Sequence, residues 1–257
     1  MRIRQLTTIA EMTAAVDLFD ALWPPGDAGS LIQPEMLRAL TKAGNYLAGA
    51  FDEDRLVGAC LGFFGPPASR SMHSHVAGVS AQHAGIGLAL KLDQREWALR
   101  HGVETISWTF DPLVGRNAYF NLTKLGATAA EYLPDFYGEM TDGVNQGAGS
   151  DRLLVSWDLA APVGRPVERG DAVIVLGRAA DGGPEIGSLD DSLPASPDGV
   201  TLLIATPSDI AALRRTDPAM ANAWRVALRE VLSPLVGEVA GFDRAGFYVV
   251  RQKGTGR

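Results

Sequence analysis

Hydrophobic and polar residues follow one another along the first part of the chain in patterns that predict helices and strands in turn. Residues 85–102 give the strongest helical pattern, with Ile86, Leu90, Trp97 and Leu99 facing inward and Gly102 ending the helix. This spacing predicts an amphipathic helix that packs one face on a core.

Strands are predicted most clearly where two segments flank the tight connection Glu53-Asp54, which is typical of a hairpin. The order of predicted elements favours an α/β (α+β mixed) fold, a mixed sheet with helices on both faces. The predicted strands are residues 2–8, 45–52, 55–65, 70–79, 103–112, 127–140 and 153–159, and the predicted helices are residues 8–23, 34–44, 85–102 and 116–126.

A change of composition separates the last part of the chain from the rest. Residues 161–200 are rich in proline and glycine. This shift predicts a domain boundary, with one domain at residues 1–160 and a small C-terminal α/β extension at residues 161–257. The extension is predicted to contain strands at 172–177, 200–206 and 246–250 and a helical region at 207–232 that Asp217-Pro218 breaks in two.

Composition and charge restrict the classes of protein to which the chain belongs. The formal net charge of −7 argues against nonspecific binding to nucleic acid or to an anionic membrane. No apolar run is long enough for a membrane span, and the N-terminus lacks a signal-peptide core. The single cysteine, Cys60, cannot form an internal disulfide, which favours a reducing cytoplasm. Histidines and carboxylates show no metal-site spacing, so no metal is expected.

A glycine-containing segment between a predicted strand and the strongest predicted helix carries the main functional signal. It reads Gln82-His83-Ala84-Gly85-Ile86-Gly87. Successive N–H groups and a helix N-terminus in such a turn favour an anion such as a pyrophosphate. A side chain at either glycine would keep the backbone away from that ligand. The alternative is a helix start whose small residues serve close packing alone.

This segment resembles the acyl-CoA loop of the GNAT superfamily of acyl-CoA-dependent N-acyltransferases, which reads Gln/Arg-x-x-Gly-x-Gly/Ala. Lys124-Leu125-Gly126-Ala127 is similar to the end of the last core helix in that family, and Ala118 stands where the family pattern usually has alanine. The resemblance covers residues 1–160. It implies a mixed, mostly antiparallel sheet flanked by helices, in a larger branch of the family with a C-terminal extension. It also implies a co-substrate, acetyl-CoA or another short acyl-CoA.

The resemblance further assigns residues to the cofactor. Pantetheine would lie between strands 70–79 and 103–112. A main-chain N–H near Val79, at a bulge that Gly78 permits, would polarise the thioester carbonyl. The predicted cofactor-binding residues are Val79, Gln82, His83, Ala84, Gly85, Ile86, Gly87, Asn117, Asn121 and Lys124, of which His83 and Lys124 are candidates for phosphate contacts.

The sequence departs from the family pattern at three places. The turn between Val79 and Gln82 is shorter than usual, and Gly115 stands where an asparagine is often found. Leu122 stands where many members carry a tyrosine that protonates the departing thiolate. Tyr119 is the candidate to replace that acid, and packing is its alternative role.

Two further residues are predicted to take part in the chemistry, because an attacking amine must lose a proton. His75 is one, since it shares a strand face with His73, Ala77 and Val79 and titrates in a suitable range. Asp111, at the end of the next strand, is the other. The alternatives are half-buried histidines satisfied by their neighbours and an aspartate that caps the turn at Pro112. Cys60 is interpreted as core, and Lys91 as a weak phosphate candidate or part of a solvated helix face.

These observations predict a cytoplasmic N-acyltransferase that moves an acyl group, acetyl by default, from acyl-CoA to a small-molecule amine by direct attack in a ternary complex. Two alternatives stay open: a non-catalytic acyl-CoA-binding regulatory module and an enzyme acting on a protein amine. The sequence also leaves a homodimer open. The extension is expected to pack on the acyltransferase domain through Trp224, Leu228 and Val231.

Overall fold

The computed structural model describes residues 1–26, 29–80, 85–138, 149–187 and 200–252. The chain forms two compact units. The first contains Met1–Trp108 and Asp158–Ala161, and the second contains Thr109–Met140, Gly147–Trp157 and Pro162–Arg257. These units group residues by their contacts and do not test whether a segment is a separate domain. The predicted domains 1–160 and 161–257 therefore stay a prediction.

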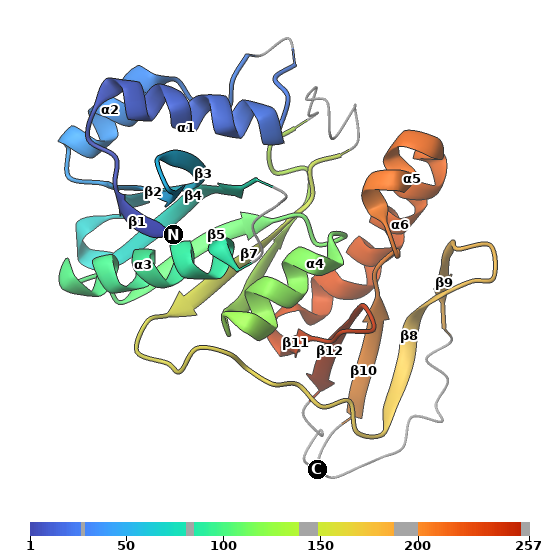
Figure 1. Cartoon of the computed structure of the whole chain (residues 1–257). Coiled ribbons are helices and arrows are strands. Elements are labelled where there is room, and N and C mark those ends of the chain that lie inside the picture. Colours follow the sequence, from blue (N-terminus) through green and yellow to red (C-terminus); the bar gives the residue numbers. More distant parts are fainter. Residues whose placement is uncertain (27–28, 81–84, 139–148, 188–199, 253–257) are drawn as a thin grey trace. The chain divides into compact units, whose positions relative to one another are not determined.

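The first unit is a twisted sheet between helices. In Figure 1, α1 and α2 lie on one side of β2, β3 and β4, and α3 lies on the other side. The strands are β1 (Arg2–Gln5), β2 (Tyr46–Asp52), β3 (Arg55–Phe64), β4 (Ser71–Val79) and β5 (Thr105–Phe110), whose last two residues belong to the second unit. The helices are α1 (Ile9–Leu22), α2 (Pro34–Lys42) and α3 (Ile86–Arg100), with a 3-10 turn, η1 (Pro67–Ser69).

The strands of this unit lie in the order β1-β2-β3-β4-β5. Neighbours from β1 to β4 pair antiparallel, and β4 pairs with β5 in parallel. A mixed, mostly antiparallel sheet flanked by helices is the predicted fold class, which is therefore confirmed. The hairpin at Glu53-Asp54 is confirmed as well, because Asp52 pairs with Arg55.

Local sequence signals explain where the first helix begins. Thr8 accepts a hydrogen bond from the Glu11 N–H, and the Glu11 carboxylate accepts from the Thr8 N–H, which is a capping box. Met12, Val16 and Phe19 then recur at helical spacing and are buried against β3. Burial of this apolar stripe stabilises the helix on the sheet.

The second unit contains a hairpin and a second sheet. Strands β6 and β7 pair antiparallel, and the other strands lie in the order β11-β12-β10-β8-β9, with α6 packed on β8, β9 and β10. The elements are α4 (Gly115–Ala118), η2 (Tyr119–Lys124), β6 (Thr128–Leu133), β7 (Arg152–Asp158), β8 (Ala172–Arg178), β9 (Pro184–Ile186), β10 (Val200–Ala205), α5 (Ile210–Thr216), α6 (Pro218–Leu232), η3 (Ser233–Glu238), β11 (Val239–Phe242) and β12 (Phe247–Gln252).

Several predicted elements of this unit need correction. The helix expected at 116–126 is α-helical only to Ala118, and Tyr119–Lys124 is a π-helix. The strand expected at 127–140 ends at Leu133, and β9 and β11 were not predicted. The break at Asp217-Pro218 is confirmed, since the Asp217 carboxylate accepts from the Met220 N–H and caps α6.

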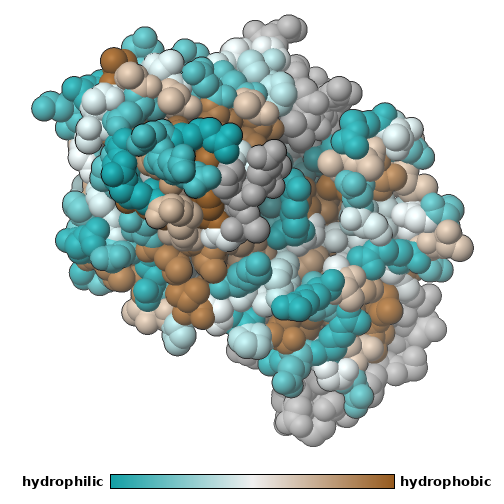
Figure 2. Space-filling model, in the orientation of Figure 1, coloured by the Kyte–Doolittle hydropathy of each residue, from teal (hydrophilic) through white to brown (hydrophobic). Residues whose placement is uncertain are grey.

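Among the helices that the structure describes, none is long and apolar enough to cross a membrane. On the face shown in Figure 2, hydrophilic residues predominate and small hydrophobic patches lie between them.

Candidate functional site

Strands β4 and β5 are paired over only part of their length. Their pairing joins Ser71 to Thr105 and ends with His73 opposite Ser107. Beyond these residues β4 continues to Val79, still paired with β3. The two parallel strands therefore separate and form a splay, at the place where the resemblance implied that pantetheine lies. Along the splay, main-chain groups of β4 do not pair with β5.

A β-bulge in β4 lies within the splay. Val76 pairs with Leu61, whereas Ser74 pairs with the next residue of β3, Gly62, so that His75 is the extra residue. The bulge was expected at Gly78, which is wrong. Gly78 pairs regularly, and its small size serves another purpose: a Cβ there would lie 2.6 Å from a methyl group of Leu22 in α1.

The bulge also changes which side chains share a face of β4. Ser74, before it, contacts Lys91 of α3, whereas Val76, after it, packs against the core on the α1 side. Strict alternation would have placed both on one face. His73 and His75 still share a face, but Val79 approaches the start of α3, so the predicted grouping with Ala77 and Val79 is wrong.

The end of β4 presents main-chain groups to the splay. The Ser80 N–H donates to the Val57 carbonyl on β3 at 2.9 Å. Main-chain groups of successive residues point to opposite sides of a strand, so those of Val79 and Ala77 point away from β3. Val79, a predicted cofactor residue, is thus suitably oriented for pairing with a ligand in the splay.

The two histidines of β4 form a cluster with Phe63 of β3. The rings of His73 and His75 are 6.3 Å apart, and the Phe63 ring lies 5.3 Å and 5.9 Å from them. Desolvation lowers the pKa of both imidazoles, and for His73 the charges of His75 and Lys91 lower the pKa further. Both rings are therefore mainly neutral at pH 7, the form that accepts a proton.

The predicted acyl-CoA loop is only partly within the described residues, because Gln82, His83 and Ala84 lie outside them. Gly85 has a φ of +89°, a left-handed conformation that disfavours side chains, and α3 begins at Ile86. A Cβ at Gly87 would meet only a methyl group of Val79, at 3.9 Å. Neither glycine therefore adds a side chain at the N-terminus of α3, which favours an anion site there.

Among the predicted catalytic residues of the second unit, Asp111 is fully engaged. Its carboxylate accepts from the Leu113 N–H at 2.9 Å and from Arg214 at 2.6 Å, and both partners of this ion pair are largely buried. The Leu113 contact is the turn cap that the sequence left open as an alternative. Arg214 comes from α5, and nothing in the local sequence predicted it.

The π-helix carries the other candidates. The Tyr119 hydroxyl accepts from Arg244 at 3.1 Å, and the Lys124 ammonium lies 5.9 Å from the Tyr119 ring. Asn117 and Lys124 are exposed, whereas Asn121 is buried. Tyr119 and Lys124 are therefore brought together, and the predicted cofactor role of Asn121 stays a prediction.

A buried polar cluster that the sequence did not predict lies between β4 and α3. Lys91 is 4% exposed, which contradicts its interpretation as a solvated or phosphate-facing residue. Its ammonium donates to Ser74 Oγ at 2.7 Å and to Gln94 Oε1 at 3.2 Å. Cys60 lies 3.9 Å from the same hydroxyl and is fully buried, so its interpretation as core is confirmed. Leu90 and Gln94 of α3 are buried like Lys91, so this face of the helix packs inward. Leu99 is 44% exposed, so its predicted inward position is wrong.

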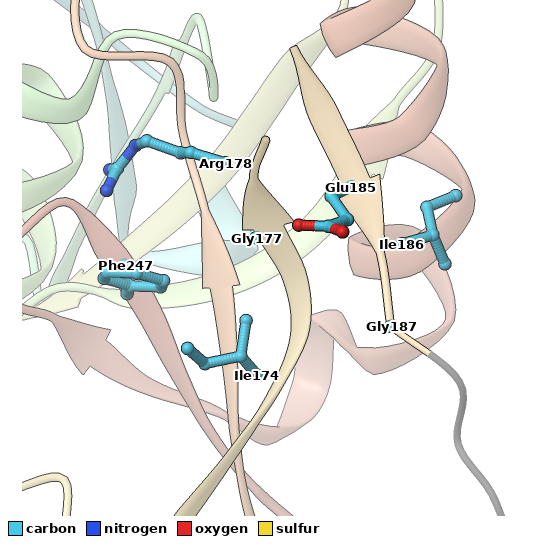
Figure 3. A pocket seen from close by; sticks show the side chains of 7 residues that line it. All are labelled: Ile174, Gly177, Arg178, Glu185, Ile186, Gly187 and Phe247. Carbon is cyan, nitrogen blue, oxygen red and sulfur yellow. The ribbon is translucent and has the colours of Figure 1, made fainter. Parts of the chain in front are cut away.

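A hollow of about 670 Å³ lies on the second unit (Figure 3). Arg178 and Phe247 lie on one side of it and Glu185 on the other. Arg178 already donates from Nε to the Thr206 carbonyl at 2.7 Å and from Nη2 to the Gly246 carbonyl at 2.9 Å. These contacts give Arg178 a structural role in joining β8 to the β12 turn.

No cluster of three or more histidine, cysteine, aspartate or glutamate side chains suited to a metal ion occurs within the described ranges. The predicted absence of a metal site stays a prediction.

Comparison with solved structures identifies the fold. A ribosomal-protein-alanine N-acetyltransferase from Brucella melitensis matches with a TM-score of 0.50 and 18% identity, over 62% of this chain and 99% of that chain. An N-acetyltransferase from Staphylococcus aureus Mu50 matches with a TM-score of 0.51 and 14% identity, over 62% of this chain and 98% of that chain. No protein-family model and no curated protein sequence matches the chain. The chain thus shares its fold with these N-acetyltransferases, in agreement with the fold expected from the sequence, and the likeness extends to the fold alone.

Proposed function

We propose that the protein is an acyl-CoA-dependent N-acyltransferase whose acceptor is a small-molecule amine. The observation that carries the proposal is the splay of β4 and β5 beyond His73 and Ser107, with a bulge at His75 inside it. The fold of known acetyltransferases and the anion-suited start of α3 at Gly85 support the same function. In this proposal the enzyme works in the cytoplasm and needs no metal.

The main chain of β4 would hold the acyl donor. Ala77 is the first residue beyond the bulge whose main-chain groups point away from β3, so we assign its N–H to the thioester carbonyl in place of the group near Val79. Val79 would then pair with the pantetheine. A fixed N–H aimed at the carbonyl oxygen stabilises the negative charge that develops there during attack.

The reaction itself is a direct transfer. The neutral amine attacks the thioester carbonyl carbon, the C–S bond breaks, and the CoA thiolate leaves and takes up a proton. His75 is the proposed base that removes a proton from the amine nitrogen, since its imidazole is mainly neutral at pH 7. Tyr119 is the proposed acid. Asp111, held by Arg214, is proposed to orient the chain at the end of β5.

One set of contacts favours a second candidate, a non-catalytic acyl-CoA-binding module. The usual acid position is the buried Leu122, Asp111 is neutralised by Arg214, and the Tyr119 hydroxyl is engaged by Arg244. An acyltransferase acting on a protein amine is a further alternative, since the acidic chain would suit a basic peptide. A homodimer is compatible with each of these functions.

Turnover and binding distinguish these functions. We expect release of CoA thiol when the protein is mixed with an acyl-CoA and a panel of small amines, whereas a regulatory module binds CoA without turnover. Modification of basic peptides but not of small amines would favour the protein acceptor.

The proposed anion site has its own test by calorimetry with CoA. Gly87→Asp should abolish CoA binding while the protein stays folded, because the new carboxylate would enter the pyrophosphate site at the α3 N-terminus. Gly87→Asn is the matched control, since it adds the same volume without the charge, and it should bind more tightly than Gly87→Asp. Equal affinity in the wild-type protein and Gly87→Asp would exclude this location for the cofactor.

A further inference from the structure

A buried ammonium group lies at the closed end of the splay. Lys91 Nζ donates to Ser74 Oγ at 2.7 Å and lies 4.0 Å from the centre of the Trp108 ring. Ser74 and Trp108 are the first residues of β4 and β5 beyond the last paired residues, His73 and Ser107. The ammonium therefore contacts one residue of each strand, at the point where the strands begin to separate.

This cluster contains more hydrogen-bond donors than acceptors. An ammonium has three N–H groups, and those of Lys91 have two acceptors in the part of the chain that the structure describes, Ser74 Oγ and Gln94 Oε1. Gln94 is fully buried, and its Nε2 has no hydrogen-bond partner there. A ligand that brings an acceptor would complete these bonds.

The cluster also lacks a counter-charge. The ion pairs found among the described residues do not include Lys91, and the Asp93 carboxylate on the same helix accepts from the Tyr46 hydroxyl. Burying a charge without a partner is costly, and an apolar side chain of similar length would avoid that cost. Lys91 is therefore suited to binding an anionic group that a ligand supplies.

The neighbouring strand is shaped around this cluster. A Cβ at Gly62 of β3 would lie 2.9 Å from Gln94 Nε2 and 3.2 Å from the His73 carbonyl, so glycine makes room for the Gln94 amide. Gln94 in turn holds Lys91 through its Oε1. The position of the ammonium is thus fixed from α3 and from β3.

We propose that Lys91 selects the acyl group, and that the protein uses a short dicarboxylic acyl-CoA whose terminal carboxylate binds Lys91 Nζ. The inference rests on the proposed function, since it requires the acyl donor to lie in the splay. It replaces acetyl, the default from the sequence, by an acyl group of the succinyl class. The carboxylate supplies both the acceptor and the counter-charge that the cluster lacks.

The distances along β4 are compatible with such a group. From Ala77, the assigned donor to the thioester carbonyl, to Ser74 is three residues, roughly 10 Å at about 3.3 Å per residue and less across a bulge. Two hydrogen bonds of about 2.9 Å and the three C–C bonds of a succinyl group, about 1.5 Å each, cover such a span. An acetyl group would end before the ammonium.

Stable thioether analogues of acyl-CoA test the proposal without knowledge of the acceptor. S-(3-carboxypropyl)-CoA and S-(3-carbamoylpropyl)-CoA have the same shape and differ in charge. By calorimetry on the wild-type protein, the carboxylate should bind about 10- to 100-fold more tightly than the amide, the range of a hydrogen bond to a charged group. In Lys91→Met the two affinities should become equal.

The controls separate this inference from the proposed function. Lys42→Met removes an exposed lysine of α2 that has no assigned role, and it should leave the affinity ratio unchanged. Equal binding of the two analogues by the wild-type protein overturns the inference, a result that does not depend on the folding of any variant. A ratio that persists in folded Lys91→Met overturns it as well. Failure of the wild-type protein to bind CoA or either analogue would instead contradict the proposed function.

Discussion

Asp151 in the second unit and Lys91 in the first unit are both buried charged residues, but their surroundings differ. The Asp151 carboxylate accepts from the Tyr132 hydroxyl at 2.8 Å and from Arg229 Nε at 2.9 Å, with Arg225 3.4 Å away. Lys91 has a hydroxyl, an amide oxygen and an aromatic ring as neighbours. Among the described residues, Asp151 is paired with opposite charges, whereas Lys91 is paired with none.

The pKa values follow this difference. Burial tends to raise the pKa of Asp151, but hydrogen bonds from Arg229 and Tyr132 outweigh burial and lower it. Burial lowers the pKa of Lys91 from 10.5 to about 8, against an opposing effect of the Cys60 thiol. A balanced buried charge is suited to holding a structure together, whereas an unbalanced one is suited to chemistry or ligand binding. The following predictions test that distinction.

The largest expected effect is on the chemistry of the first unit. His75→Ala should lower kcat by about 10²–10⁴, the usual contribution of a general base, and leave the affinity for acyl-CoA and the melting temperature nearly unchanged. In the wild-type protein, kcat/KM should fall as the pH drops through the lowered pKa of His75, because only the neutral imidazole accepts a proton.

His101→Ala is the matched control for this variant. His101 stacks on Trp97 at the end of α3, with ring centres 3.8 Å apart, and should be dispensable for kcat. Normal turnover by His75→Ala would leave water or the amine's own ionisation as the route for the proton.

The second prediction concerns the stability of the second unit. Asp151→Ala should reduce the free energy of unfolding by about 3 kcal/mol, because it leaves the buried Tyr132 hydroxyl and the half-buried Arg225 and Arg229 without their carboxylate. Arg229 also contacts Asp135, at 2.9 Å, so part of the network would persist. Denaturant unfolding measures the change.

The exposed Glu230 on the same helix provides the comparison for Asp151. Glu230→Ala should change the free energy of unfolding by less than about 0.5 kcal/mol. Similar values for the two variants would show that the Asp151 network contributes no more than a surface charge.

The smallest predicted effect is the pH dependence that Lys91 gives to stability. Below pH 8 the ammonium is charged in both states, and its burial destabilises the folded protein. Between pH 8 and 10.5 the unfolded chain binds the additional proton, so this penalty disappears as the pH rises. Relative to Lys91→Met, the wild-type protein should gain up to about 3 kcal/mol over this range, at about 1.4 kcal/mol per pH unit.

Comparing the two proteins at each pH removes the contribution of other titrating groups, such as the buried Tyr46, whose pKa is raised mainly by burial. A difference in stability that is constant from pH 7 to 10 would mean that the folded protein does not depress the pKa of Lys91.

The sequence predicted the first unit well because its signals are local. A capping residue such as Thr8, the tight turn at Glu53-Asp54 and the apolar spacing of residues 85–102 each act over a few positions. Gly85 likewise marks the start of α3 through its own backbone conformation. The fold class could therefore be derived before any contact was known.

The bulge at His75 and the π-helix at Tyr119–Lys124 could not be derived in this way. The bulge is visible only when Ser74 and Val76 are paired with adjacent residues of β3. In the π-helix, the Thr123 hydroxyl donates to the Phe242 carbonyl at 2.6 Å, a contact between residues far apart in the sequence. Both irregularities depend on a partner that local periodicity does not specify.

By itself, the sequence determined most helices and strands of the first unit and the start of α3 at Gly85, because local propensity and spacing set these features. The tertiary structure alone decided which charges are balanced. Arg214 neutralises Asp111 from 103 positions away, and Lys91 is buried because α3 packs it against Ser74 of β4 and Trp108 of β5. The reason is that charge compensation and burial depend on long-range packing, which no short stretch of residues encodes.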